Sequence, residues 1–153
     1  MTWEEINFDE ALWVIPGSRY KTGIDHAVPL SSATRDVLRR RPRKGRYVLA
    51  GLKPGQPFNG AGPAMRDLRI RLADCETFQI HDLRRTVRTG LSRLNVDEAT
   101  AELVLGHVLQ GIKRVYDRHN RLDERRQALQ RWADFISLTV NSTKAVVPLA
   151  RRA

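Results

Sequence analysis

The sequence predicts an α+β fold in which a small antiparallel sheet near the N-terminus packs on a mainly helical body. Two short apolar runs, residues 12–15 and 26–30, are each bounded by turn-forming residues, a pattern that is typical of strands. From Pro63 onward the apolar residues recur at helical spacing instead. The sheet is therefore expected in the first part of the chain and the helices in the rest.

The N-terminal part also contains a further strand and a first helix. Residues 3–8 are expected to add a third strand to the sheet, and Ser31 or Ser32 to cap a helix that ends near Arg40. On this helix, Val37 and Leu38 are expected to face the core. Residues 41–62 are rich in Gly, Pro, Lys and Arg, which predicts mostly loop around one buried strand or turn at 47–49.

The helix expected over about residues 81–94 carries the most information. Its apolar stripe consists of Leu83, Val87, Leu91 and Leu94. On a helical wheel His81, Arg85 and Arg88 share the opposite face, and Arg84 lies at the border between the two faces. A guanidinium at that border is expected to be partly buried, so that it needs an anion or a carboxylate as its partner.

Two more helices are expected in the second half of the chain. Asn95 or Asp97 is expected to cap one that ends at Gly106, since glycine is common directly after a helix. The other is expected over about residues 123–138. Its apolar stripe consists of Leu122, Leu129, Trp132, Ala133, Ile136 and Val140. Residues 1–140 are expected to form one domain, and residues 141–153 a flexible C-terminal tail.

The composition favours a nucleic acid as the partner. The chain has 27 Lys and Arg against 17 Asp and Glu, a formal net charge of +10, and a basic surface attracts polyanions. No apolar run approaches the roughly 18 residues that a membrane span needs. The single cysteine and the absence of a Cys/His cluster with zinc spacing give no reason to expect a metal. A cytoplasmic location is the simplest expectation.

Four features with catalytic potential follow one another along the chain. Lys21 lies in a turn between two strands, His81-Asp82-Leu83-Arg84 begins a helix, Leu105-Gly106-His107 ends the next one, and Tyr116 comes nine residues after His107. In this order and at these spacings, the set resembles the catalytic domain of the tyrosine recombinase (phage integrase) family. Short sequence motifs of that family are also matched by the segments HDLRRT, LVLGH, VYDRH, LWVIP and HAVPLS.

The resemblance implies that the chain cleaves and rejoins double-stranded DNA through a 3′-phosphotyrosine intermediate, with no cofactor and no metal. Tyr116 would be the nucleophile and Lys21 the general acid. Arg84, His81 and His107 would activate the phosphate, a role for which the planar, always charged fork of arginine is well suited. Arg85 and Arg88 are expected to contact DNA. Family members act as tetramers on DNA, which is the expectation for the full-length protein.

Each of these residues also has an ordinary structural explanation when it is taken alone. Tyr116 would be a half-buried core aromatic, His81 a helix residue, His107 a C-cap, and Lys21 a turn lysine. Arg84 would be the salt-bridge partner of Asp82 or Glu102. The functional interpretation depends on the ordered set.

The chain also departs from the family pattern. The first of the family's two catalytic arginines would precede Met1, and the helical N-terminal DNA-binding domain has no counterpart. We therefore expect a fragment with weak or no activity on its own. Two alternatives are a non-catalytic DNA-binding remnant and an enzyme similar to type IB topoisomerases. The sequence identifies neither the DNA target site nor the kind of mobile element.

Overall fold

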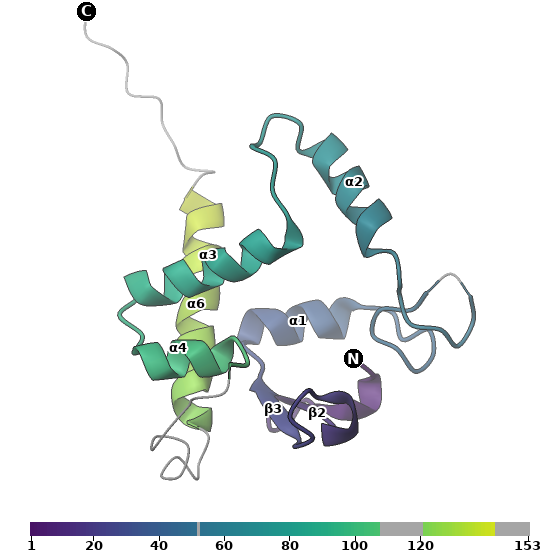
Figure 1. Ribbon diagram of the computed structural model, residues 1–153, viewed down its shortest axis with the longest axis horizontal. Coiled ribbons are helices and arrows are strands. Elements are labelled where there is room, and N and C mark those ends of the chain that lie inside the picture. Colours follow the sequence, from purple (N-terminus) through teal and green to yellow (C-terminus); the bar gives the residue numbers. More distant parts are fainter. Residues whose placement is uncertain (52, 108–120, 143–153) are drawn as a thin grey trace, which may run out of the picture.

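A three-stranded sheet and five α-helices make up the part of the chain that the structure, a computed structural model, describes: residues 1–51, 53–107 and 121–142 (Figure 1). In chain order the elements are η1 (Trp3–Glu5), β1 (Ile6–Asn7), β2 (Leu12–Ile15), η2 (Gly17–Arg19), β3 (His26–Pro29), α1 (Ser32–Arg40), α2 (Ala61–Arg71), α3 (Ile80–Arg93), α4 (Glu98–Val104) and α6 (Leu122–Ser142). This arrangement confirms the predicted α+β class.

The sheet is antiparallel throughout, with strand order β1-β2-β3. Trp13 on the central strand lies opposite Ile6 on one side and Val28 on the other. Strands were expected over 12–15 and 26–30, and both are present. The strand expected over 3–8 is shorter, because residues 3–5 form the 3₁₀ helix η1. The Glu5 side chain accepts the Thr2 N–H at 3.0 Å, which closes this turn.

A first hydrophobic core lies between the sheet and α1. It consists of Ile6, Ala11, Leu30, Leu38 and Val48, with Met1, Trp3, Phe8 and Trp13 packed against it. Ser31 caps α1 as expected, since its hydroxyl accepts the Thr34 N–H at 3.3 Å. The expectation that Val37 also faces the core was wrong, because that side chain is exposed. Adjacent helix residues point about 100° apart, so Leu38 takes the inward position alone.

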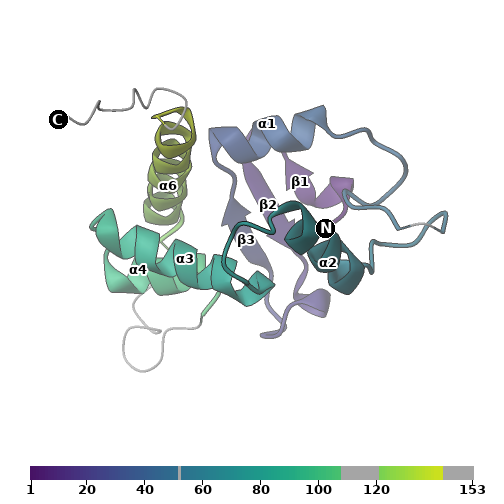
Figure 2. The same cartoon turned by 90° about the horizontal axis from the view of Figure 1, so that it is seen from above.

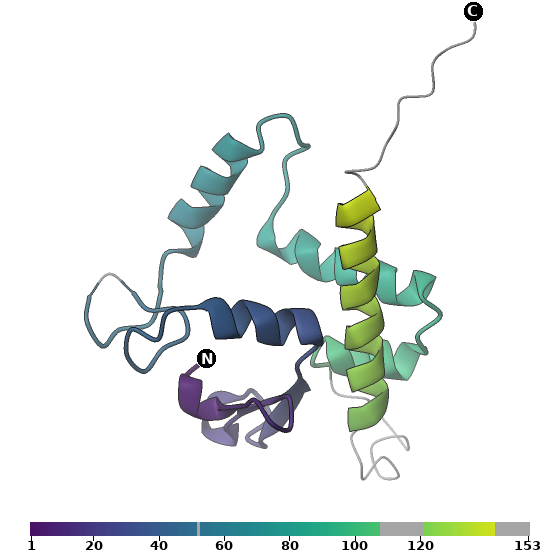
Figure 3. The same ribbon diagram turned by 180° about the vertical axis from the view of Figure 1, so that it is seen from behind.

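A second core joins α3, α4 and α6. It consists of Leu91, Ala101 and Ala128, with Val87, Val96, Val104 and Trp132 packed against it. Figure 3 shows α3 crossing α6. Gly90 allows this close crossing, because a Cβ there would lie 2.1 Å from the Trp132 ring. The apolar stripes predicted for α3 and α6 extend beyond the buried faces of these helices, since Leu83, Ile136 and Val140 are all exposed.

Helix α6 lies beside α3 and α4 and also reaches the sheet and α1 (Figure 2). Arg125, only 1% exposed, donates a hydrogen bond from Nη1 to the Ala27 carbonyl of β3 at 2.9 Å. Arg126 donates to the Glu10 carbonyl at 2.9 Å, and Gln130 exchanges two 2.9 Å hydrogen bonds with Ser32. These contacts fix the sheet relative to α3 and α4, and the candidate site lies where these parts meet.

Residues 41–62 are mostly loop, as expected, and α2 begins at Ala61. Val48 is buried, and its neighbour Tyr47 forms an isolated bridge to Thr2. The helix α2 has no buried residue and stands apart from the sheet in Figures 1 and 3. Within the described ranges, no helix is long and apolar enough to cross a membrane.

The carboxylate of Glu5 is a testable stabilising group of the sheet. Its side chain is 11% exposed, accepts hydrogen bonds from Thr2 N and Trp13 Nε1, and pairs with Arg19. Burial by itself raises the pKa of Glu5, but these hydrogen bonds outweigh it and lower the pKa from 4.5 to about 2. The stabilisation is therefore complete above pH 4.5 and is lost as the pH falls through about 2.

We expect Glu5→Gln to lower the free energy of unfolding at neutral pH by about 1–3 kcal/mol and to flatten its decline between pH 4.5 and 2. Urea unfolding over a pH series measures both effects. Glu4→Gln is the matched control, because Glu4 is exposed and lies 3.9 Å from Arg46. An acid decline in Glu5→Gln as steep as that of the unmodified chain would contradict the prediction.

Candidate functional site

The first turn of α3 carries two of the expected site residues. The backbone N–H of Gln79 donates to the Asp82 carboxylate at 2.9 Å, which caps the helix and fixes where it begins. His81 follows on an exposed position of this turn, and Arg84 lies three residues later in a partly buried position. The predicted border position of Arg84 is therefore confirmed.

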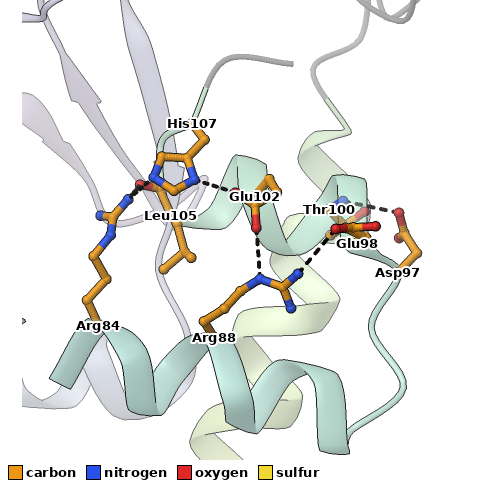
Figure 4. Close-up of polar contacts among 8 residues, drawn as sticks. All are labelled: Arg84, Arg88, Asp97, Glu98, Thr100, Glu102, Leu105 and His107. Atoms are coloured by element: carbon orange, nitrogen blue, oxygen red, sulfur yellow. Dashed lines mark hydrogen bonds and ion pairs between the residues drawn. The ribbon is translucent and has the colours of Figure 1, made fainter. Parts of the chain in front are cut away.

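The guanidinium of Arg84 bonds to the chain segment that follows α4 (Figure 4). Its Nη2 donates to the Leu105 carbonyl at 2.6 Å and lies 2.7 Å from His107 Nε2. Arg84 was expected to have an anion or a carboxylate as its partner. The two carboxylates considered for this role have other partners, since Asp82 pairs with Arg85 and Glu102 with Arg88. Within the described ranges no carboxylate forms an ion pair with Arg84. Among these residues, its guanidinium is therefore available to bind an anion.

Gly106 turns the chain so that His107 reaches Arg84. Its φ of +70° is a conformation that side chains disfavour, and a Cβ at this position would lie 2.9 Å from the Tyr20 hydroxyl. The His107 N–H donates back to the Glu102 carbonyl at 2.9 Å, which completes the helix end. Asp97 caps the start of the same helix through the Thr100 N–H at 3.1 Å. Both expected ends of this helix are confirmed.

A chain of polar contacts extends from His107 back to α3 (Figure 4). His107 Nδ1 bonds to Glu102 Oε2, and Arg88 Nε donates to Glu102 Oε1 at 2.8 Å. Arg88 also pairs with Glu98 at 3.7 Å. The hydrogen bonds from His107 and then from Arg88 hold the pKa of Glu102 below its ordinary value of 4.5. Glu102 is therefore an ionised acceptor.

The two arginines expected to contact DNA differ in their surroundings. The side chain of Arg85 is 74% exposed, and its ion pair with Asp82 at 3.3 Å lies on the surface. The side chain of Arg88 is 33% exposed and faces α4 through its two glutamate partners. Arg85 thus presents the more accessible charge.

The turn that carries Lys21 adjoins the end of α4. Lys21 itself is exposed, but the hydroxyl of the preceding Tyr20 donates to the Gly106 carbonyl at 3.2 Å. The Tyr20 ring stacks on His26, with centroids 4.5 Å apart and an interplanar angle of 3°. Burial first, and then the charges of Arg125 and Lys21, lower the pKa of His26. These contacts hold the Lys21 turn beside His107.

The structure thus brings Arg84 and His107 into contact and places the Lys21 turn next to them. His81 lies nearby on the exposed side of α3, and Tyr116 lies outside the described residues. Sequence reasoning missed Tyr20, and it considered Glu102 only as a partner of Arg84. The position of Tyr20 directly before Lys21 was the one signal available for it. Within the described ranges, no group of three or more His, Cys, Asp or Glu could hold a metal ion.

Comparison with known proteins gives a consistent result. Residues 1–122 match the model of the phage integrase family. The chain is 29% identical over 154 residues to prophage integrase IntA of Escherichia coli strain K12, covering 97% of this chain and 37% of that protein. It is 30% identical over 140 residues to prophage integrase IntZ of the same strain, covering 88% and 34%. The chain spans about a third of the length of these curated relatives. No solved structure gives a significant match.

Proposed function

This chain belongs to the phage integrase family, and we propose that it cleaves and rejoins DNA strands in site-specific recombination. The observation that carries the proposal is the contact between Arg84 and His107. The end of α4 brings an imidazole to 2.7 Å from a guanidinium that has no carboxylate partner among the described residues. Two adjacent groups of this kind are suited to binding the two non-bridging oxygens of a phosphodiester.

In the proposed reaction the Tyr116 oxygen attacks the scissile phosphorus and forms a 3′-phosphotyrosine bond. The bond from phosphorus to the 5′ oxygen breaks, and Lys21 supplies the proton that this oxygen needs. The proton of the Tyr116 hydroxyl leaves by way of His81 or solvent. Rejoining reverses these steps with the 5′ hydroxyl of another strand. The energy of the phosphodiester is kept in the tyrosine link, so the cycle needs no cofactor.

Arg84 and His107 act on the charge that grows during the attack. The non-bridging oxygens gain negative charge as the tyrosine oxygen approaches, and fixed N–H donors stabilise them without reorganising. Arg84 is held in place by the Leu105 carbonyl, and His107 by Glu102. Both side chains are therefore held in position before DNA binds.

Double-stranded DNA is the proposed partner. The formal net charge of +10 favours binding to phosphates, and the exposed Arg85 is the proposed contact beside the site, with Arg88 next to it on α3. We propose that the full-length protein acts as a tetramer on DNA. The 153-residue chain alone is proposed to react weakly, because it corresponds to about a third of its relatives.

A suicide substrate tests the proposal. Nicked duplexes from the DNA that flanks the gene lose a short strand after cleavage, which traps the covalent intermediate. We expect a slowly formed protein–DNA band that survives SDS, with the DNA on Tyr116 by peptide mass mapping. DNA binding without any adduct would favour the non-catalytic alternative, and relaxation of supercoiled DNA without a specific site would favour the topoisomerase alternative.

A further inference from the structure

We propose that Glu102 is a positioning residue that orients the ring of His107 and fixes which of its nitrogens carries the proton. This inference rests on the proposed function, in which His107 binds the scissile phosphate. In Figure 4 the imidazole lies between two groups, with Nε2 facing Arg84 at 2.7 Å and Nδ1 facing the Glu102 carboxylate. Each ring nitrogen thus has its own partner.

The chemistry of the two partners determines the tautomer. A guanidinium has N–H donors and no acceptor, so His107 Nε2 accepts the hydrogen bond from Arg84. A neutral imidazole then carries its proton on Nδ1, and Nδ1 donates it to Glu102. An ionised carboxylate has no proton to donate, so this polarity cannot reverse.

The same bond to Glu102 serves the phosphate-bound state. A phosphodiester is an anion that offers acceptors, so Nε2 must take up a proton from solvent in order to donate to it. The ring then carries a positive charge, which the Glu102 carboxylate at Nδ1 compensates. The protonated Nε2 no longer accepts from Arg84 Nη2, which keeps its hydrogen bond to the Leu105 carbonyl. Glu102 therefore holds the His107 ring in one place while Nε2 of that ring changes from acceptor to donor.

The Glu102 carboxylate is held in place by a second hydrogen bond, on the oxygen that does not face His107. Glu102 uses Oε2 for His107 and Oε1 for Arg88 Nε, at 2.8 Å. Arg88 lies one helical turn after Arg84 on α3, and Leu91 and Ala101 are fully buried between α3 and α4. Arg84 acts on His107 directly, and Arg88 acts through Glu102. Two arginines of one helix thus define the position of the imidazole.

A simpler role for Glu102 is that of a salt bridge between α3 and α4. Two substitutions separate that role from positioning. Glutamine at 102 has a single acceptor oxygen, so it cannot accept from Arg88 Nε and His107 Nδ1 in the present geometry. Glu98→Gln is the matched control, because it removes a charge from the same Arg88 at 3.7 Å and has no contact with His107.

The readout is the ¹H–¹⁵N spectrum of the histidine rings in the ¹⁵N-labelled chain, recorded at a pH at which an ordinary imidazole is neutral. A His107→Gln variant assigns the signals. We expect the Nδ1–H tautomer for His107 in the unmodified chain and in Glu98→Gln. We expect its loss in Glu102→Gln, because the ring is then no longer held with Nε2 toward Arg84. Single-turnover cleavage of the nicked duplex should fall about 10–100-fold in Glu102→Gln, the range found when carboxylates that orient metal-bound histidines are removed.

The outcomes distinguish this inference from the proposed function. A His107 with its proton on Nε2 in the unmodified chain would overturn the inference, even if Glu102→Gln failed to fold. An unchanged tautomer in folded Glu102→Gln would also overturn it. Failure of the unmodified chain to form any adduct would instead overturn the proposed function, whereas the spectra would still decide the contact between Glu102 and His107.

Discussion

Replacing Tyr116 by phenylalanine is expected to abolish the covalent protein–DNA adduct and to leave DNA binding and thermal stability unchanged. The substitution removes one oxygen atom and keeps the aromatic ring, so it changes little apart from the hydroxyl chemistry. Without that oxygen the phosphodiester has no protein nucleophile, and no other step of the proposed reaction can begin. The measurement is the SDS-stable band formed with the nicked duplex.

The other two tyrosines of the chain provide matched controls. Tyr47 lies in the loop after α1, so Tyr47→Phe should form the adduct at the rate of the unmodified chain. Tyr20 is the more critical control, because its hydroxyl donates to the Gly106 carbonyl at 3.2 Å and so lies close to the site. We expect Tyr20→Phe to retain the adduct. An adduct that persisted in Tyr116→Phe and disappeared in Tyr20→Phe would assign the nucleophile to Tyr20.

Local sequence patterns were sufficient for the elements of the fold. The turn residues around 12–15 and 26–30 predicted β2 and β3. The candidate caps predicted where α1 and α4 start, and of each pair considered the structure uses Ser31 rather than Ser32 and Asp97 rather than Asn95. These signals act within a few residues of the element they define. Periodicity was less informative about burial. Leu83 belongs to the predicted apolar stripe of α3, yet its side chain is 56% exposed.

The partners within the candidate site could not be predicted in the same way. The position of Arg84 followed from the helical wheel, but its contacts with Leu105 and His107 depend on how α3 and α4 are placed relative to each other. The contact between Tyr20 and Gly106 joins residues 86 positions apart. The buried Arg125 is a similar case, since a basic residue on an amphipathic helix is normally expected at the surface.

The tertiary arrangement explains why the motifs are spaced as they are. Arg84 and His107 belong to separate helices, and the turn between α3 and α4 is short enough for the second core to hold them together. Gly106 then places His107 beyond the end of α4, where the Tyr20 hydroxyl meets the same turn. The fold therefore brings the motifs of Arg84 and His107 together and ties Tyr20, the residue before Lys21, to the same turn.

Arg84→Lys is expected to lower the single-turnover rate of DNA cleavage by about 10²–10³-fold, the usual cost of losing a preorganised transition-state donor. Lysine keeps the positive charge, so DNA binding at saturating protein should remain. The loss arises from geometry. Arg84 Nη2 alone bonds to the Leu105 carbonyl at 2.6 Å and faces His107 at 2.7 Å, which leaves the rest of the fork for phosphate oxygens. One ammonium group cannot occupy these positions together.

Arg85→Lys is the matched control, since it makes the same change at the next residue of α3. Its side chain points to solvent and pairs with Asp82 at the surface, so a lysine there should preserve both the charge and the cleavage rate. Cleavage by Arg84→Lys at the rate of the unmodified chain would remove Arg84 from the reacting centre. Equal losses in the two variants would indicate a general effect of α3 on DNA binding, whereas a loss confined to Arg84→Lys would assign the transition-state contact to that one guanidinium.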